Sequence, residues 1–160
     1  MINYNQITPE IFIGSYPSNR LDVERLKNGL KITAVFNLQT DKDFVDWGID
    51  WKELSGIYLQ TDMVVERVPI LDFDAVDLSA QLSRAVDVLD RLIKVGHRVY
   101  VHCTAGIGRA PAAVIAYLAW CLDWTIDDAE AHVLNSRSCA PNMDAIRHAD
   151  AERTIKEQST

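Results

Sequence analysis

Apolar residues along the chain fall into short continuous runs and into longer stretches with helical spacing. The short runs predict buried β-strands, at residues 10–14, 32–38, 64–70 and 98–101. The longer stretches predict helices, at residues 21–30, 78–93, 110–122, from 125 to about 135 and from about 142 onwards. Thr125 and Asp128 indicate a capping box at the start of the fourth helix. Residues 39–62 follow neither period, and we expect an irregular segment with one short helix there.

This alternation of strands and helices predicts an α/β fold, with a central, mostly parallel sheet flanked by helices. A chain of 160 residues suits one domain with one core. No repeat, low-complexity tract or interdomain linker divides it. We therefore expect a single domain over residues 1–160.

The charge of the chain disfavours anionic partners. The formal net charge is −7, and residues 41–80 hold ten acidic against three basic side chains. Such a surface is a poor partner for nucleic acid or anionic lipid. No apolar run reaches transmembrane length and no signal peptide is evident. Three cysteines, an odd number, do not suggest a disulfide framework. We expect a monomeric protein of a reducing compartment, without nucleic acid or membrane partners.

The stretch from Cys103 to Arg109 predicts the chemistry. It lies between the predicted strand at 98–101 and the predicted helix at 110–122. A loop in this position can turn its backbone N–H groups toward a phosphate at the N-terminus of the helix. Two glycines permit the sharp turns and the close approach that such a loop needs. The predicted phosphate-binding loop consists of Thr104, Ala105, Gly106, Ile107, Gly108 and Arg109.

Cys103 is the predicted nucleophile and Arg109 the predicted phosphate ligand. A free cysteine thiol has a pKa of about 8.5 and is mostly protonated at neutral pH. The loop amides, the helix dipole and Arg109 all favour the thiolate form. The planar guanidinium of Arg109 can hold two phosphate oxygens at once. The pattern is that of a cysteine-dependent phosphatase, which forms a cysteinyl-phosphate without a metal or other cofactor. The remaining histidines lack ligand-like spacing, namely His97, His132 and His148.

A phosphatase also needs a group that protonates the leaving oxygen. Three carboxylic acids precede the predicted helix at 78–93 and could serve, namely Asp72, Asp74 and Asp77. A turn or helix-cap role is the favoured interpretation of Asp77. We expect His102 to buttress the loop through hydrogen bonds.

Several segments spread over the chain resemble the dual-specificity phosphatases, and most closely the plant starch-excess type of glucan phosphatase, with laforin more distant. The segments that carry this resemblance are Tyr4–Asn5, Ile13–Ser15, Phe36–Asp43, Trp47–Asp50, Asp72–Asp74, Cys103–Ala112, Arg137–Pro141 and Ala145–Arg147. The Cys-to-Arg loop is shared by all related phosphatases. Three segments distinguish the glucan phosphatases better, namely Asn37–Gln39, Trp47–Asp50 and Gly108–Ala112.

The resemblance implies removal of phosphate from a starch- or glycogen-like glucan. It also selects Asp72 as the general acid, since the family places this acid about thirty residues before the nucleophile. Trp47 and Phe73 match the positions of a sugar-stacking platform, because flat aromatic faces complement the C–H groups of sugar rings. Weaker candidates for the platform are Trp51, Tyr58, Trp120 and Trp124.

Three departures from the family pattern matter. The residue after the loop arginine is commonly Ser or Thr in the wider superfamily, and Ala110 predicts a slower second step. Ala140 replaces an aromatic that the plant relatives often have before the matching proline. The 160 residues leave no room for a carbohydrate-binding module. We expect Cys121 to be a core residue and Cys139 to be a structural or surface thiol.

Two alternatives remain beside the glucan phosphatase. One is a dual-specificity protein phosphatase acting on phosphotyrosine and phosphoserine or phosphothreonine. The other is a non-catalytic scaffold that binds phosphoglucan. The expected compartment is the cytoplasm, or the plastid stroma after removal of a transit peptide.

Overall fold

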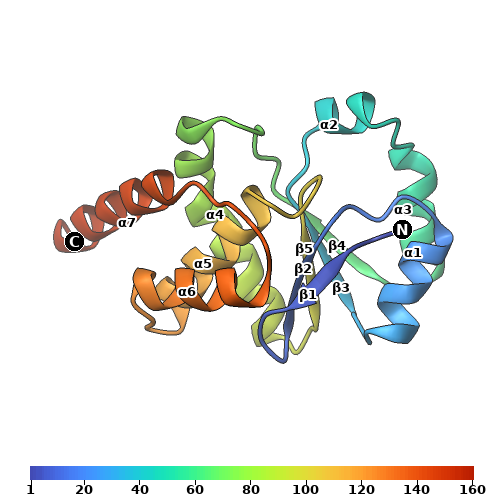
Figure 1. Cartoon of the computed structure of the whole chain (residues 1–160), viewed down its shortest axis with the longest axis horizontal. Coiled ribbons are helices and arrows are strands. Elements are labelled where there is room, and N and C mark those ends of the chain that lie inside the picture. The colour runs from blue at the N-terminus through green and yellow to red at the C-terminus, as the bar shows by residue number, and fades with distance from the viewer.

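The computed structural model describes all residues from Met1 to Thr160, and Figure 1 shows how its helices and strands are arranged. The strands are β1 (Tyr4–Gln6), β2 (Ile11–Gly14), β3 (Ala34–Asn37), β4 (Val64–Arg67) and β5 (Val99–His102). The helices are α1 (Arg20–Glu24), which continues into the π-helical turn η1 (Arg25–Gly29), α2 (Asp41–Asp46), α3 (Trp51–Gln60), α4 (Ala75–Lys94), α5 (Arg109–Cys121), α6 (Ile126–Ser136) and α7 (Met143–Gln158). None of these helices is both long enough and apolar enough to cross a membrane.

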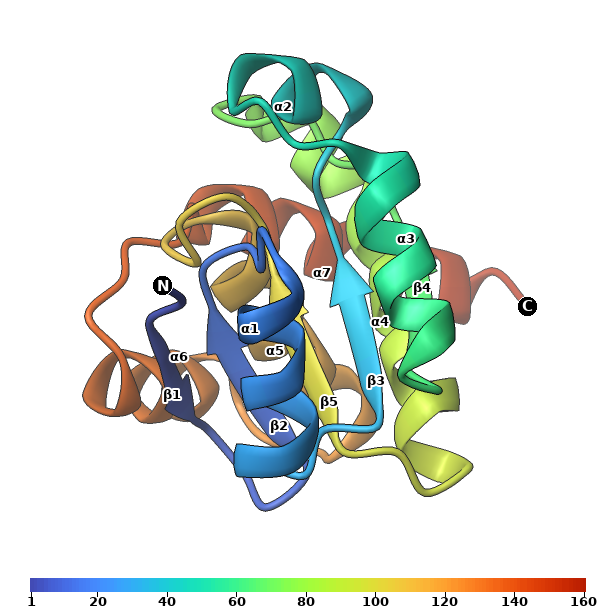
Figure 2. The same ribbon diagram turned by 90° about the vertical axis from the view of Figure 1, so that its right-hand side faces the viewer.

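The five strands form one sheet in the order β1-β2-β5-β3-β4. Strand β1 pairs antiparallel with β2, whereas every other pairing is parallel. Strand β5 therefore lies at the centre of the sheet, between β2 and β3 (Figure 2). The predicted α/β fold with a mostly parallel sheet is confirmed.

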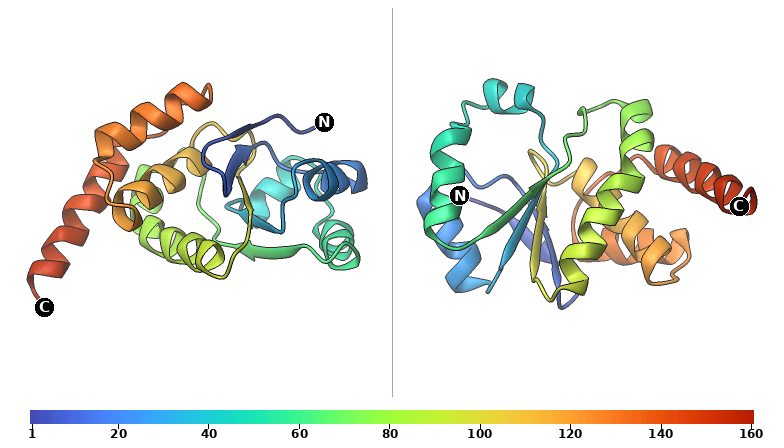
Figure 3. Two further views of the ribbon diagram at one scale, coloured as in Figure 1. Left: turned by 90° about the horizontal axis from the view of Figure 1, so that it is seen from below. Right: turned by 180° about the vertical axis from the view of Figure 1, so that it is seen from behind.

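Helices cover both faces of the sheet, and each face has its own apolar cluster. Helices α4, α5, α6 and α7 lie on one side and α1 and α3 on the other (Figures 1 and 3). Successive strand residues point to opposite faces. In β5, Val99 and Val101 belong to the 31-residue cluster under α4 and α5, whereas Tyr100 belongs to the 11-residue cluster on the other side. Burial on both faces explains why these strands appear in the sequence as continuous apolar runs.

The structure corrects the prediction for residues 39–62, which contain two helices, α2 and α3, instead of one. Helix α2 begins at a capping box, in which Thr40 and Asp43 each accept the backbone N–H of the other. Helix α3 is capped by Asp50, whose side chain accepts the backbone N–H of Glu53. Its Leu54 and Ile57 are buried at helical spacing, and the surrounding polar residues obscured this short apolar stripe.

Two strand predictions also differ from the structure. The run at 64–70 was expected to be a strand throughout, but β4 ends at Arg67. Pro69 follows, and because proline has no backbone N–H it cannot donate to a neighbouring strand. Strand β1 is absent from the prediction because Tyr4–Gln6 is polar and lies at the sheet edge. Pairing with β2, and not burial, makes this segment a strand.

Candidate active site

The predicted phosphate-binding loop connects the central strand β5 to the N-terminus of α5. It lies at the carboxyl ends of the parallel strands, which is the usual position of ligand sites in open α/β sheets. Gly106 has a φ of +70°, and a Cβ there would lie 2.5 Å from the backbone oxygen of Gly14. Glycine is therefore required at this turn both for its conformation and for the close approach of the two chain segments.

A cavity of about 640 Å³ opens over this loop. Cys103, Arg109 and Asp72 all line it, so the structure brings the three predicted catalytic side chains to one place. Trp47 and Phe73, the two predicted platform residues, line the same cavity. Cys103 is 3% exposed and has no disulfide partner. The other predicted loop residues line the cavity except Gly106.

The guanidinium of Arg109 is buried, and both of its Nη atoms have partners within the chain. Its Nη1 donates to Asp43 Oδ2 at 2.7 Å and to the Ile70 carbonyl at 2.8 Å. Its Nη2 lies 3.3 Å from Thr104 Oγ1 and 3.2 Å from Asp72 Oδ2. The buried Nε has no partner within the chain. Because a buried donor without an acceptor is costly, this Nε is suited to donate to a phosphate oxygen.

Asp43 is a residue of the site that the sequence analysis missed. Burial would by itself raise the pKa of Asp43, but the hydrogen bonds and charge of Arg109, together with Thr40, outweigh it and lower the pKa. Asp43 is therefore ionised at neutral pH and forms a buried ion pair with Arg109. The available signal was the capping-box spacing of Thr40 and Asp43, which predicts the helix cap without predicting the second role.

The three candidate acids have different hydrogen-bond partners, although Asp72 and Asp74 both line the cavity. The Asp74 side chain caps α4 by accepting the Asp77 backbone N–H at 2.8 Å. The Asp77 side chain accepts the backbone N–H of Leu71 at 2.7 Å. Asp72 faces the cavity beside Arg109, with its side chain 37% exposed. Asp74 and Asp77 thus hold the helix start and the loop, and Asp72, which pairs with Arg109, stays the predicted general acid.

The predicted hydrogen bond from His102 to the loop is present. The His102 Nδ1–H donates to the Cys103 carbonyl at 2.9 Å. Burial lowers the pKa of His102 to about 4, so the imidazole is neutral under physiological conditions. A neutral, fully buried ring supports the loop and is not placed to move a proton at the substrate.

The aromatic residues divide into a cavity rim and the core. Trp47 is 57% exposed and Phe73 is fully exposed. Phe73 also has a φ of +57°, a conformation that costs about 1–3 kcal/mol in a non-glycine residue and is enriched at functional sites. Tyr16 lies against Trp47 with ring centroids 6.2 Å apart. Its place in the sequence gave no signal of this contact.

The weaker platform candidates do not reach the cavity. The ring of Trp51 stacks on that of Phe44 with centroids 5.1 Å apart, and Tyr58 is a buried residue of α3. Trp120 and Trp124 pack against the large apolar cluster, and the Trp120 Nε1–H donates to Asp150. These four aromatic residues therefore serve packing.

Neither of the remaining cysteines lines the cavity. Cys121 and Cys139 are half-buried and pack against the large apolar cluster. Burial raises the pKa of both thiols, which keeps them protonated at neutral pH. Both are therefore consistent with the predicted structural roles.

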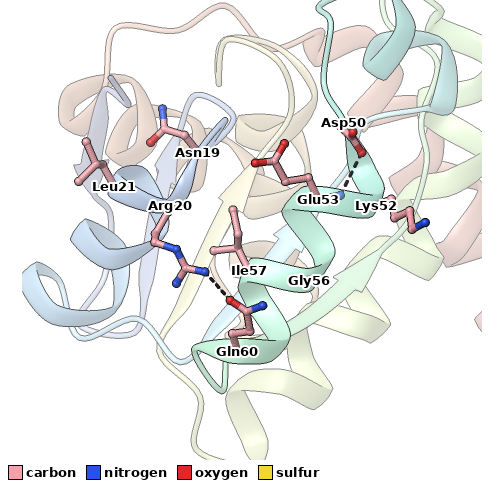
Figure 4. Close-up of a pocket in the computed structure, with 9 residues that line it drawn as sticks. All are labelled: Asn19, Arg20, Leu21, Asp50, Lys52, Glu53, Gly56, Ile57 and Gln60. Carbon is pink, nitrogen blue, oxygen red and sulfur yellow. Dashed lines mark hydrogen bonds between the residues drawn. The ribbon is translucent and has the colours of Figure 1, made fainter.

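A second hollow, of about 740 Å³, lies between α1 and α3 (Figure 4). Its lining includes both acidic and basic side chains, and it shares no residue with the cavity at Cys103. Arg20 donates to Gln60 across it, and Asp50 accepts the Glu53 backbone N–H at its rim.

Comparison with known proteins defines the class of this site. The sequence profile of the dual specificity phosphatase catalytic domain matches residues 11–149. The chain therefore belongs to the dual specificity phosphatase family.

The fold agrees with this assignment. PTPMT1 superposes with a TM-score of 0.77 at 19% identity, covering 99% of this chain and 100% of that one. The human tyrosine phosphatase-like serine/threonine/tyrosine-interacting protein superposes with a TM-score of 0.73 at 23% identity, covering 96% and 97%.

Sequence similarity indicates a narrower group within this family. The chain is 38% identical to the amyloplastic phosphoglucan phosphatase DSP4 of Castanea sativa, over 94% of this chain and 40% of that protein. It is 36% identical to the chloroplastic phosphoglucan phosphatase LSF1 of Arabidopsis thaliana, over 92% and 25%. Laforin of Mus musculus is 30% identical over 97% and 50%. The chain thus spans between a quarter and a half of the length of these relatives. The predicted resemblance to glucan phosphatases and laforin is confirmed.

Proposed function

We propose that this chain removes phosphate monoesters from a starch- or glycogen-like glucan through a cysteinyl-phosphate intermediate. The observation that carries the proposal is one cavity with the phosphate-binding loop and the exposed aromatic side chains of Trp47 and Phe73 on its walls. Similarity to proteins named phosphoglucan phosphatases supports the choice of substrate.

In the first step, the Cys103 thiolate attacks phosphorus in line with the glucosyl oxygen. The S–P bond forms while the P–O bond to the glucan breaks, and Asp72 donates its proton to the leaving oxygen. Arg109 holds the phosphoryl oxygens through the free Nε and through Nη2. This fork neutralises the charge that develops on the equatorial oxygens.

In the second step, water attacks the phosphorus of the cysteinyl-phosphate. Asp72, now ionised, accepts a proton from this water, the S–P bond breaks, and inorganic phosphate leaves. Ala110 is buried in the first turn of α5 and has no hydroxyl to assist the departing thiolate. Activation of the water therefore depends on Asp72, and we expect this step to be the slower one.

The rim of the cavity favours a sugar over a highly charged headgroup. Trp47 and Phe73 offer apolar faces that match the C–H groups of glucose rings. The loop interior between Cys103 and Arg109 has no Lys or Arg to hold additional phosphates. The neighbouring acidic segment, residues 41–80, further disfavours polyanionic substrates.

The same relatives support a proposal for the domain, its partner and its compartment. We propose that residues 1–160 are the phosphatase catalytic domain, with phosphorylated glucan as its partner. The chloroplastic and amyloplastic relatives favour the plastid stroma over the cytoplasm as its compartment. The expected monomer, and the expected lack of nucleic acid and membrane partners, stay predictions.

Phosphate release from solubilised phosphoglucan, measured beside a phosphotyrosine peptide, tests the proposal. The wild-type chain is expected to release phosphate from the glucan, and Cys103→Ser is expected to abolish turnover while sparing glucan binding. Activity on the peptide alone would favour the protein phosphatase. Glucan binding without turnover of either substrate would favour the scaffold.

A further inference from the structure

Arg137 is a buried arginine that none of the catalytic roles uses. It follows the last residue of α6 and is 6% exposed. The segment after α6 runs past β1 and the phosphate-binding loop (Figure 2), and the Arg137 side chain bonds to both. No carboxylate lies within ion-pairing distance of it, since all its acceptors are amide and carbonyl oxygens. Burying a guanidinium without a counter-ion is costly, so the role of Arg137 is to be sought in the groups that it binds.

Two of these bonds fix carbonyl groups of the phosphate-binding loop. Arg137 Nε donates to the Gly106 carbonyl at 2.7 Å, and Nη2 donates to the Ala105 carbonyl at 3.0 Å. The other loop carbonyls are also held from outside. In order from residue 103 to residue 107, the donors are His102 Nδ1, Tyr16 N, Arg137 Nη2, Arg137 Nε and Ala140 N. All five consecutive carbonyls therefore point away from the interior of the loop.

The direction of these carbonyls determines the direction of the amides. In a trans peptide the C=O and N–H groups point to opposite sides, and the chain has no cis peptide bond. Because Arg137 binds the carbonyls of Ala105 and Gly106, the next amides, those of Gly106 and Ile107, face away from Arg137. Neither amide donates a hydrogen bond within the chain. The two amides are thus left for an anion above Cys103.

Two asparagines, Asn5 in β1 and Asn3 just before it, hold Arg137 in position. Arg137 Nη1 donates to Asn5 Oδ1 at 2.9 Å, and Nη2 donates to Asn3 Oδ1 at 2.6 Å. The guanidinium therefore bridges the β1 segment and the loop, and each of its three nitrogens donates at least one hydrogen bond. The space is tight, since a Cβ on Gly106 would lie 2.8 Å from Arg137 Nη2.

We infer that Arg137 is a positioning residue for the phosphoryl group, which acts by setting the direction of the Gly106 and Ile107 amides, and that Asn3 and Asn5 set Arg137. The inference rests on the proposed cysteine phosphatase chemistry and is independent of the glucan. Its second effect is electrostatic, because the unpaired positive charge lies directly behind the loop that receives an anion.

Binding of inorganic tungstate, a phosphate-shaped oxyanion, tests this role by calorimetry, together with turnover of para-nitrophenyl phosphate. For Arg137→Met we expect tungstate affinity to fall at least about 10-fold and kcat to fall about 100-fold, the scale for losing an aligned oxyanion donor. The KM for the small substrate is expected to change much less than kcat. Arg147→Met is the matched control, because Arg147 is exposed and pairs with Asp127 on the surface.

Arg137→Lys separates geometry from charge. Lysine keeps the positive charge but lacks the fork that reaches two carbonyls, so we expect it to restore less than a tenth of the lost kcat. If Arg137→Met does not fold, the double variant Asn3→Ala/Asn5→Ala decides, because both asparagines are exposed. We expect it to weaken tungstate binding about 3- to 10-fold with little change in melting temperature.

Two results would overturn the inference. One is a folded Arg137→Met variant with unchanged tungstate affinity and kcat, and the other is full rescue by lysine. If Arg137→Met does not fold, unchanged tungstate binding in the asparagine variant has the same meaning. Failure of the glucan proposal would leave these results intact, since neither tungstate nor para-nitrophenyl phosphate contains a sugar.

Discussion

The guanidinium of Arg109 has structural partners on both Nη atoms and a buried Nε that we propose to bind the substrate phosphate. Asp43 and the Ile70 carbonyl hold Nη1, while the buried Nε has no acceptor in the chain. Such a division fixes the plane of the fork before the phosphate arrives. Preorganised donors of this kind stabilise transition-state charge without a reorganisation cost at the moment of reaction. Asp43 therefore matters to the account although it does not line the cavity.

Asp43→Asn is expected to lower kcat for para-nitrophenyl phosphate by about 10- to 100-fold, because Arg109 loses its charged anchor. The same change is expected to destabilise the fold by about 2 kcal/mol, since a bond between two charged buried groups is weakened. Steady-state kinetics and urea denaturation measure the two effects. Asp41→Asn on the same helix is the control, because the Asp41 side chain is exposed and pairs with Arg67. Equal kinetics for the two variants would contradict the assignment of Asp43.

At the scale of elements, the loop before α4 carries the proposed general acid Asp72 beside the helix cap Asp74. We expect Asp72→Asn to lower kcat/KM by about 100-fold or more, as for loss of a general acid, with an unchanged melting temperature. We expect Asp74→Ala to cost about 1 kcal/mol of stability through loss of the N-cap, with turnover within a few-fold of wild type. Kinetics and thermal unfolding of both variants distinguish the residues. The reverse pattern would make Asp74 the acid.

Elements with strong local signals were predictable from the sequence. The central strand follows from a short apolar run, and α4 and α5 follow from longer stretches with helical spacing. The Asp50 and Thr40 caps became interpretable only when α2 and α3 were seen. The loop from Cys103 to Arg109 was predictable because its chemistry is contiguous in sequence. The roles of Asp43 and Arg137 were not predictable. The partner of Asp43 lies 66 residues away in the sequence, and the partners of Arg137 lie at least 31 residues away. Long-range hydrogen bonds of this kind leave no local periodicity.

At the scale of the whole molecule, the buried His102 links stability to pH. Its pKa is about 4 in the folded chain against 6.5 for the free side chain. Between these values the unfolded state binds more protons than the folded state, so stability falls as the pH is lowered from 6.5 to 4. The difference between the two pKa values of His102 corresponds to about 3 kcal/mol in the free energy of unfolding.

Urea denaturation at pH 7.5 and at pH 4.5 measures this loss. We expect His102→Asn to remove most of the histidine contribution to the difference between the two pH values, whereas the exposed His148→Asn should leave it unchanged. An identical pH dependence in wild type and His102→Asn would contradict the neutral, buried state of the ring.

The proposed function itself depends on the whole cavity, in which a phosphate-binding loop from β5 meets an aromatic rim from α2 and the α4 loop. The most direct test is the ratio of kcat/KM for solubilised phosphoglucan to kcat/KM for para-nitrophenyl phosphate, compared between wild type and the Trp47→Ala/Phe73→Ala variant. Leu59→Ala, an exposed apolar position on α3, is the control. We predict that the ratio falls at least about 10-fold in the double variant, because sugar stacking is lost while the loop is untouched. An unchanged ratio would contradict the aromatic platform and with it the choice of glucan as substrate.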